Sequence, residues 1–199
     1  MTVALVDSGG ANLNSVIQAL KRLKVSCEVT CDAKKISQAS HVIIPGVACT
    51  GQVMKKLREK HLVECLIHLK QPTLGICLGM QLLYDFSDED ETACLGLISG
   101  TVQRFDSQKG RAVPHMGWNR VWKKSSNEAH PLLIDIPDGS YFYFVHSYFA
   151  GCYDAVVAEA NYGERVSAVV QKNNFFGVQF HPEKSSGVGA QLLRNFLQL

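Results

Sequence analysis

The first half of the chain alternates short apolar runs with segments of helical spacing. Apolar runs at residues 2–6, 27–30, 41–44 and 72–76 are typical of buried strands. After the first run, apolar residues recur at helical spacing over 14–23, and a second helical segment covers 52–69. Strands that alternate with helices pair in parallel, because each helix returns the chain to the same edge of the sheet. The order predicts an α/β fold whose mostly parallel sheet is covered by helices on both faces.

The second half of the chain has a different pattern of predicted secondary structure. Residues 97–105, 119–122, 141–145, 155–160, 167–171 and 177–180 are predicted as successive strands with little helix between them. A helix returns only over 187–199. Since the sequence shows no linker, internal repeat or low-complexity segment, we expect a single domain, residues 1–199, with a β-rich extension in its second half.

Composition excludes several classes of protein. The net charge is +2, from 20 Lys and Arg against 18 Asp and Glu, and the basic clusters lack interleaved aromatic residues. Neither nucleic acid nor a membrane is therefore an expected partner, and the apolar runs are far shorter than the roughly 20 residues that span a bilayer. The seven cysteines form no Cys-x-x-Cys pair, and the N-terminus has no basic region of a signal peptide, so we expect reduced thiols and a cytoplasmic location.

The segment Gly-Ile-Cys-Leu-Gly-Met-Gln, residues 75–81, sets Cys77 apart from the other cysteines. It stands between an apolar strand and a predicted helix over 78–85, with a glycine two residues away on each side. Small residues at these positions let a strand turn sharply into a helix and expose the residue between them. The pattern predicts Cys77 as a nucleophile at a strand-to-helix turn.

A base and an acid stand at the end of another predicted strand. His181 and Glu183 are two residues apart, so in extended chain both side chains point to one side. A free thiol, with a pKa near 8.5, is only slightly ionised at neutral pH. A neighbouring imidazole and a helix N-terminus both favour the thiolate. We therefore expect Cys77, His181 and Glu183 to form a catalytic triad in which Glu183 orients the base.

Acyl transfer also requires donors for the negative oxygen of its intermediate. The backbone N–H of Leu78 directly follows the nucleophile. Residues 45–48 end a neighbouring parallel strand and could bring a second N–H, from Val47. Because ligands of open α/β sheets bind beyond the carboxyl ends of the strands, Gly46, Cys77 and His181 are predicted to meet at one site.

Together, these motifs resemble the class I, triad-type glutamine amidotransferases. Three further stretches carry the resemblance toward one family within that class: Pro-His-Met-Gly-Trp-Asn at 114–119, Tyr-Phe-Tyr-Phe-Val-His-Ser-Tyr at 141–148 and Gly-Val-Gln-Phe-His-Pro-Glu-Lys-Ser at 177–185. With Ala-Asn-Leu-Asn-Ser at 11–15, they are similar to the glutaminase subunits of imidazole glycerol phosphate synthase. The resemblance runs from the first strand to the last helix.

The resemblance implies a flavodoxin-like fold and a glutaminase that supplies ammonia, in histidine biosynthesis, to a cyclase with a (β/α)₈ barrel in a heterodimer. It implies no cofactor and no metal. The resemblance also implies which residues bind the substrate glutamine: Gly46, Gln81, Glu89, His146, Ser147 and Tyr148. It further implies that the surface facing the cyclase is formed by Asn12, Ser15, Pro114, His115, Met116, Gly117, Trp118 and Lys184.

One position departs from the family pattern. Ala48 stands where the family usually has glycine, and alanine lacks the backbone freedom that glycine has. If residues 45–48 must reorient to complete the oxyanion site, Ala48 puts the ease of that motion in doubt. Two other functions stay open at this point: a Cys-His-Glu peptidase or hydrolase on a related α/β fold, and a non-catalytic regulatory subunit.

Overall fold

A computed structural model describes residues 1–7, 13–46, 48–107, 110–124 and 129–199. Its centre is a parallel sheet in the order β2-β1-β3-β4-β13. The strands are β1 (Val3–Val6), β2 (Cys27–Thr30), β3 (His41–Ile44), β4 (Thr73–Ile76) and β13 (Phe175–Val178). This strand order, 2-1-3-4-5 along the sheet, is that of flavodoxin-like folds. The predicted doubly wound fold is confirmed.

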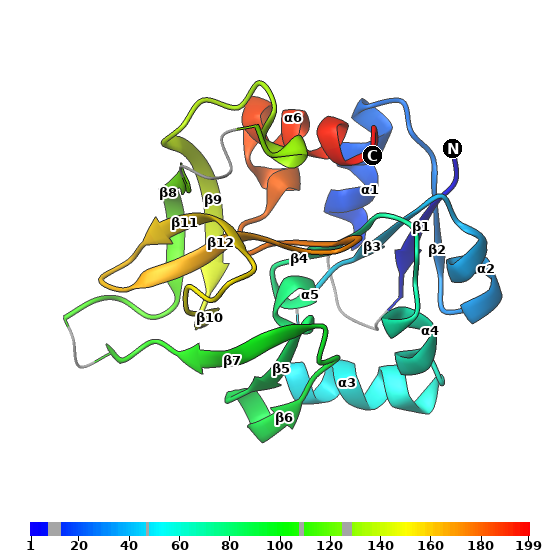
Figure 1. Ribbon diagram of the computed structural model, residues 1–199, viewed down its shortest axis with the longest axis horizontal. Helices are drawn as coiled ribbons and strands as arrows, with labels where there is room; N and C mark the ends of the chain where they lie inside the picture. Colours follow the sequence, from blue (N-terminus) through cyan, green and yellow to red (C-terminus); the bar gives the residue numbers. More distant parts are fainter. Residues whose placement is uncertain (8–12, 47, 108–109, 125–128) are drawn as a thin grey trace.

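Antiparallel strands continue the same sheet, and a second, smaller sheet is mixed, because its central pair, β5 and β7, is parallel. β12 (Arg165–Lys172), β11 (Val156–Asn161), β8 (His115–Lys123) and β9 (Ser140–His146) follow β13 in that order. The small sheet has the order β10 (Tyr148–Ala150), β7 (Ile98–Arg104), β5 (Tyr84–Ser87) and β6 (Thr92–Ala93). The β8–β9 ribbon lies at the end of the sheet opposite β2, and β9 packs against α6 (Figure 1). The expected β-rich extension is present.

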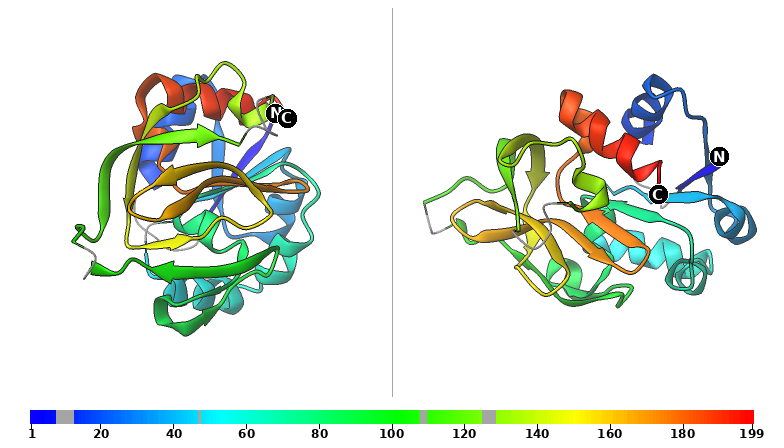
Figure 2. Two further views of the ribbon diagram at one scale, coloured as in Figure 1. Left: turned by 60° about the vertical axis from the view of Figure 1, so that its left-hand side comes forward. Right: turned by 45° about the horizontal axis from the view of Figure 1, so that its top comes forward.

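Helices cover both faces of the main sheet (Figures 1 and 2). α1 (Leu13–Arg22) and α6 (Ser186–Phe196) pack on one face. α2 (Ala33–Gln38), α3 (Thr50–Glu59), α4 (Val63–Ile67) and α5 (Leu78–Gln81) pack on the other. Alternation along β1 explains the two cores, since Val3 and Leu5 join the first cluster while Ala4 and Val6 join the second. Within the described ranges, no helix combines the length and apolarity needed to cross a membrane.

Two predicted helices were too long. The segment 52–69 is two helices, because α3 ends in a left-handed residue, His61, at φ +53°. There Leu62 N–H bonds the Leu57 carbonyl and His61 N–H bonds that of Arg58, which is a Schellman ending. The predicted helix over 78–85 ends after Gln81, because the chain then enters β5 to pair with β7. β5, β6, β10 and α2 were not predicted, although Asp32 caps α2 through the N–H groups of Lys34 and Lys35.

Gly79 lets α5 approach the end of β3. A Cβ atom added there would lie 1.8 Å from the carbonyl oxygen of Ile44, a backbone atom that cannot swing away. We expect Gly79→Ala to lower the free energy of unfolding by about 3 kcal/mol, because the backbone must shift to relieve the clash. Denaturant unfolding measures the loss. Gly187→Ala is the matched control, since a Cβ there meets nothing within 4 Å; equal stability of both variants would contradict the close approach.

Candidate active site

A cavity of about 320 Å³ lies at the carboxyl ends of β3, β4 and β13. It is large enough for a small ligand. Residues predicted from distant parts of the sequence meet in its wall. The lining residues are Gly46, Ala48, Cys77, Leu78, Gln81, Glu89, Pro114, Val145, His146, Ser147, Tyr148 and His181. The structure therefore brings the predicted nucleophile, base and substrate-binding residues together.

Cys77 occupies the sharp turn between β4 and α5. Its backbone lies at φ 52° and ψ −110°, a conformation rare for a residue with a side chain. The turn is held by the Cys77 N–H, which bonds the Val178 carbonyl at 2.7 Å, and by the Cys77 carbonyl, which accepts from Met80 and Gln81. Gly75 allows this geometry, because a Cβ there would lie 2.4 Å from the Gly79 carbonyl oxygen. Strain of this kind concentrates at functional sites.

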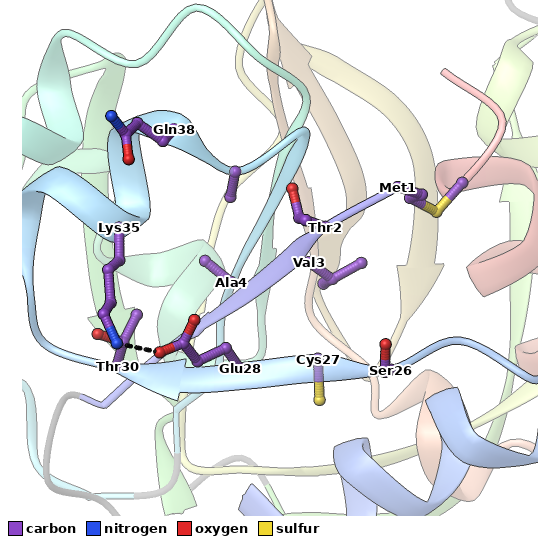
Figure 3. Close-up of a pocket in the computed structure, with 11 residues that line it drawn as sticks. Met1, Thr2, Val3, Ala4, Ser26, Cys27, Glu28, Thr30, Lys35 and Gln38 are labelled. Carbon is purple, nitrogen blue, oxygen red and sulfur yellow. Dashed lines mark hydrogen bonds and ion pairs between the residues drawn. The ribbon is translucent and has the colours of Figure 1, made fainter.

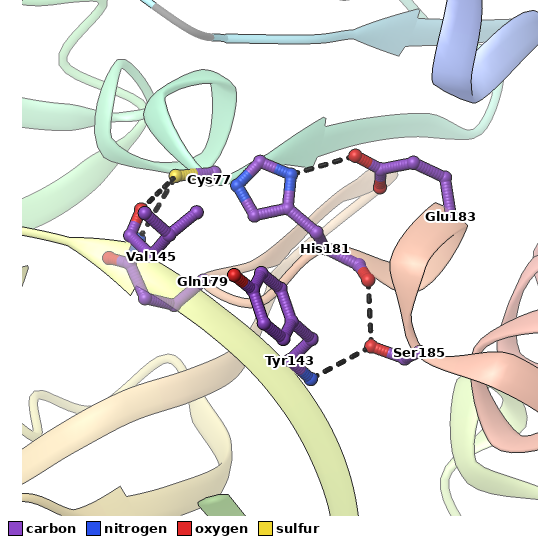
Figure 4. Close-up of polar contacts among 7 residues, drawn as sticks. All are labelled: Cys77, Tyr143, Val145, Gln179, His181, Glu183 and Ser185. Atoms are coloured by element: carbon purple, nitrogen blue, oxygen red, sulfur yellow. Dashed lines mark hydrogen bonds and ion pairs between the residues drawn. The ribbon is translucent and has the colours of Figure 1, made fainter. Parts of the chain in front are cut away.

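His181 and Glu183 follow β13, and the His181 ring lies between Cys77 on one side and Glu183 on the other (Figure 4). His181 Nδ1 lies 2.7 Å from Glu183 Oε1, and both side chains are only 2% exposed. Since a carboxylate can only accept, Nδ1 carries the hydrogen. The other ring nitrogen, Nε2, points toward the sulfur of Cys77 (Figure 4). Thiol, imidazole and carboxylate thus stand in the order that nucleophilic catalysis requires.

The electrostatics of the site favour a protonated imidazole. Burial acts to lower the pKa of His181, but the negative charge of a Cys77 thiolate and the hydrogen bond and charge of Glu183 outweigh burial and raise that pKa to about 10. A protonated His181 can deliver a proton to a leaving group. It can also stabilise a thiolate at Cys77.

The predicted oxyanion loop approaches the nucleophile closely. A Cβ at Gly46 would lie 2.4 Å from the Cβ of Leu78 and 2.6 Å from the Gly79 nitrogen, so only glycine at this position allows the chain after β3 to lie this near to α5. Leu78 is the first residue of α5, where helix geometry leaves the N–H without an intrahelical acceptor. Val47, the predicted second donor, lies outside the described residues. Ala48 is exposed at the cavity.

Gln81 and Glu89 present oxygens to the cavity. Gln81 Nε2 donates to the Tyr148 carbonyl at 2.8 Å and to Gln179 Oε1 at 2.9 Å, which leaves its own oxygen for a ligand. Glu89 Oε2 accepts from the backbone N–H and the hydroxyl of Thr50, at 2.8 and 2.7 Å. Two acceptor groups suit a cationic ligand group. The roles of Thr50 and Gln179 were missed in the sequence, although Gln179 stands within the predicted strand over 177–180, two residues before His181.

His146 lines the cavity, but both of its ring nitrogens are already engaged. Nδ1 bonds the Tyr148 carbonyl at 2.8 Å, and Nε2 lies 2.9 Å from His115 Nδ1. Burial lowers the pKa of His146 to about 3 and that of His115 to about 4, so both rings are neutral near pH 7. The side chain of His146 therefore supports the Tyr148 carbonyl, and its contact with glutamine stays a prediction. His115, predicted at a partner surface, is likewise buried.

The other residues predicted at a partner surface differ in their exposure and location. Met116 and Trp118 are 67% and 53% exposed on β8, and Pro114 precedes them at the cavity mouth. Lys184 is exposed with its Nζ 5.9 Å from the ring centre of Tyr143 on β9. Gly117 lies between the two exposed side chains, and Ser15 lies in α1. Asn12 lies outside the described residues.

A larger hollow, of about 470 Å³, lies at the amino-terminal side of β1 and β2 (Figure 3). Lys35 and Glu28 form an ion pair across it, and both side chains are more than half exposed. Cys27 is also in its wall, but the described lining residues place no base beside that thiol. Size alone therefore does not make this hollow the reactive site.

Comparison with known proteins agrees with the fold and with the family that the sequence resembles. Residues 4–199 match the family "Glutamine amidotransferase class-I". The chain is 46% identical over 197 residues to the imidazole glycerol phosphate synthase subunit HisH of Xylella fastidiosa, covering 99% of this chain and 97% of that one. It is also 46% identical over 200 residues to the HisH of Pectobacterium atrosepticum, with full coverage of both.

Solved structures show the same architecture. A glutamine amidotransferase structure superposes with a TM-score of 0.74 at 18% identity, covering 98% of this chain and 97% of that one. Another, from Thermotoga maritima, gives a TM-score of 0.65 at 18% identity, covering 100% and 83%. At these identities the likeness concerns the fold.

The fold, the cysteine turn and the family match define a class I glutamine amidotransferase. Within that class, the chain belongs to the family of HisH, the subunit of imidazole glycerol phosphate synthase. The predicted family and enzyme class are confirmed, and the peptidase alternative is set aside. The relatives are named as subunits, which implies a partner subunit.

Proposed function

We propose that this chain hydrolyses glutamine to glutamate and ammonia at Cys77 and passes the ammonia to a cyclase that forms imidazole glycerol phosphate in histidine biosynthesis. The observation that carries the proposal is the strained Cys77 turn facing a buried His181–Glu183 pair. The family match over residues 4–199 supports one domain for the whole chain. Seven free cysteines among the described residues fit a reducing, cytoplasmic location.

The first half-reaction forms a thioester. The Cys77 thiolate attacks the side-chain amide carbon of glutamine, and the amide oxygen becomes negative. The N–H of Leu78 and a donor from residues 45–48 stabilise that oxygen. His181 gives its Nε2 proton to the departing nitrogen, so that the C–N bond breaks and ammonia leaves. Glu183 stays ionised throughout and holds the imidazole by Nδ1.

The second half-reaction consumes water. His181, now neutral at Nε2, takes a proton from a water molecule that attacks the thioester carbon. The C–S bond breaks, glutamate forms and the thiolate–imidazolium pair returns. Glu89 and the Gln81 oxygen are placed to hold the substrate α-ammonium, and Ser147 and Tyr148 line the same wall.

The proposed partner is a cyclase with a (β/α)₈ barrel, bound as a heterodimer. Met116 and Trp118 expose large apolar side chains next to the cavity mouth, and such patches mark protein interfaces. Trp118 lies beside Tyr143, whose ring also faces Lys184, so β8, β9 and the residue after the triad acid form one continuous surface. Ammonia released at Cys77 then has a short path to the partner.

We expect the isolated chain to be a slow glutaminase that the cyclase and its nucleotide ligand accelerate about 100-fold or more. An acceleration of this size lies at or somewhat above the upper end of the usual coupling free energies between two sites, about 1–3 kcal/mol. Glutamate release is measured for the chain alone, with the cyclase, and with the cyclase and its nucleotide. Other amide and peptide substrates serve as controls. No release under any condition would support the non-catalytic alternative, and full activity alone would contradict the role of the partner.

A further inference from the structure

Gln179 is fully buried and lies directly after β13, two residues before His181. Its Nε2 is 3.6 Å from Cys77 Sγ, and its Oε1 accepts from Gln81 Nε2 at 2.9 Å (Figure 4 shows the contact with sulfur). One amide therefore touches both the reacting sulfur and a residue that lines the substrate cavity. The mechanism described above assigns it no part.

The orientation of this amide follows from its neighbours. The backbone carbonyl of Tyr148 can only accept, and it lies 2.8 Å from the Gln81 side-chain nitrogen. Gln81 must therefore turn its nitrogen toward Tyr148 and Gln179, so the atom of Gln179 that meets it is an oxygen. The nitrogen of Gln179 is then left facing Cys77. His146, which donates to the same Tyr148 carbonyl at 2.8 Å, fixes that acceptor in place.

The two groups that touch the sulfur favour different protonation states. The carbonyl oxygen of Val145 lies 3.8 Å from Sγ and can accept a hydrogen from the thiol, but it repels a thiolate. The Gln179 N–H can donate to either form, and a donor bonds the charged form more strongly. His181 is the titratable group facing the sulfur, and Glu183 is bound to His181.

We propose that Gln179 is a further catalytic residue, whose side-chain N–H donates to the Cys77 thiolate and holds it for attack while its oxygen positions Gln81. The proposal rests on the proposed glutaminase function. It predicts separable effects on kcat and KM, because the nitrogen of the amide bonds the thiolate and its oxygen bonds Gln81, a residue proposed to contact substrate.

Two variants separate these effects. Gln179→Glu keeps an oxygen toward Gln81 but places a carboxylate oxygen against the sulfur, so kcat for glutamine falls about 10-fold or more while KM stays within about two-fold. Gln179→Met removes both contacts, so kcat falls about 10-fold and KM rises. In both variants the pH at which alkylation of Cys77 by iodoacetamide reaches half its maximal rate moves upward by about one unit. Mass spectrometry of the Cys77 peptide separates this thiol from the other six.

Asn195→Leu is the matched control. Asn195 is also a buried amide, but it bonds the carbonyls of Leu132 and Ile134 at the C-terminal helix. The substitution Asn195→Leu should lower the thermal unfolding midpoint and leave alkylation of Cys77 unchanged. Alkylation profiles of folded Gln179→Met and Gln179→Glu that coincide with the wild type would overturn the proposal. A wild-type chain that releases no glutamate would instead refute the glutaminase function, while the alkylation comparison would still stand.

Discussion

Cys77→Ala is expected to fold normally and to lose glutaminase activity to below about one-thousandth of the wild-type rate. The loss follows because no other group can form the thioester, and removing a nucleophile leaves only the small catalysis due to binding and the oxyanion donors. Cys77→Ser should be almost as inactive, because a hydroxyl ionises far less readily than a thiol. Both residues keep a Cβ and so tolerate φ 52° about as well as cysteine does.

The measurement is glutamate release with the cyclase and nucleotide present, together with thermal unfolding. Cys31→Ala is a suitable control, since Cys31 is exposed and is not among the residues lining the cavity. It should retain wild-type turnover. Normal turnover by well-folded Cys77→Ala or Cys77→Ser would sink the assignment of the nucleophile.

The triad was predictable because its signals are local. Two glycines around Cys77 specify a sharp turn, and the short spacing of His181 and Glu183 keeps the two residues together. The extended geometry expected for this pair was wrong, because β13 ends at Val178 and Glu183 lies in a short 3₁₀ helix, Pro182–Lys184. The alternation of strands and helices then places the ends of parallel strands at one edge, which brings the motifs together without knowledge of side-chain contacts. The structure confirms the meeting of these strand ends.

Contacts between distant segments could not be predicted in this way. The pairing of His115 with His146 depends on the register of β8 against β9, which places these two residues opposite each other. Before that register is known, both histidines look like free polar groups. The small sheet was missed for a related reason, because β5 is only four residues long and is stabilised by pairing with β7, more than ten residues further along.

In the folded chain, Ala48 is not the position at which close packing requires glycine. The glycine that close packing demands is Gly46, whose Cβ would collide with Leu78. Ala48 is exposed at the cavity rim, where a methyl group is sterically tolerated. The structure thus places a steric requirement for glycine at position 46, while the expected effect of Ala48 on backbone motion of the loop stays a prediction.

Glu183→Gln should lower kcat about 1,000-fold with little change in fold, because the amide is isosteric but carries no charge. The charge of Glu183 helps to raise the pKa of His181, so its removal lowers that pKa. His181 must be protonated to release ammonia. The alkaline limb of the pH profile of kcat should therefore move to lower pH in the variant, while the wild type keeps its acid over a wider range.

Glu64→Gln provides the control for this change, since Glu64 is an exposed carboxylate on α4 that pairs only loosely with His68. Its activity and pH profile should match the wild type. Glu183→Asp tests geometry separately from charge, because the shorter side chain keeps the anion but moves it away from Nδ1, and an intermediate loss is expected. A Glu183→Gln profile with an unshifted alkaline limb would show that the protonation of His181 is set by Cys77 alone, with Glu183 only anchoring the ring.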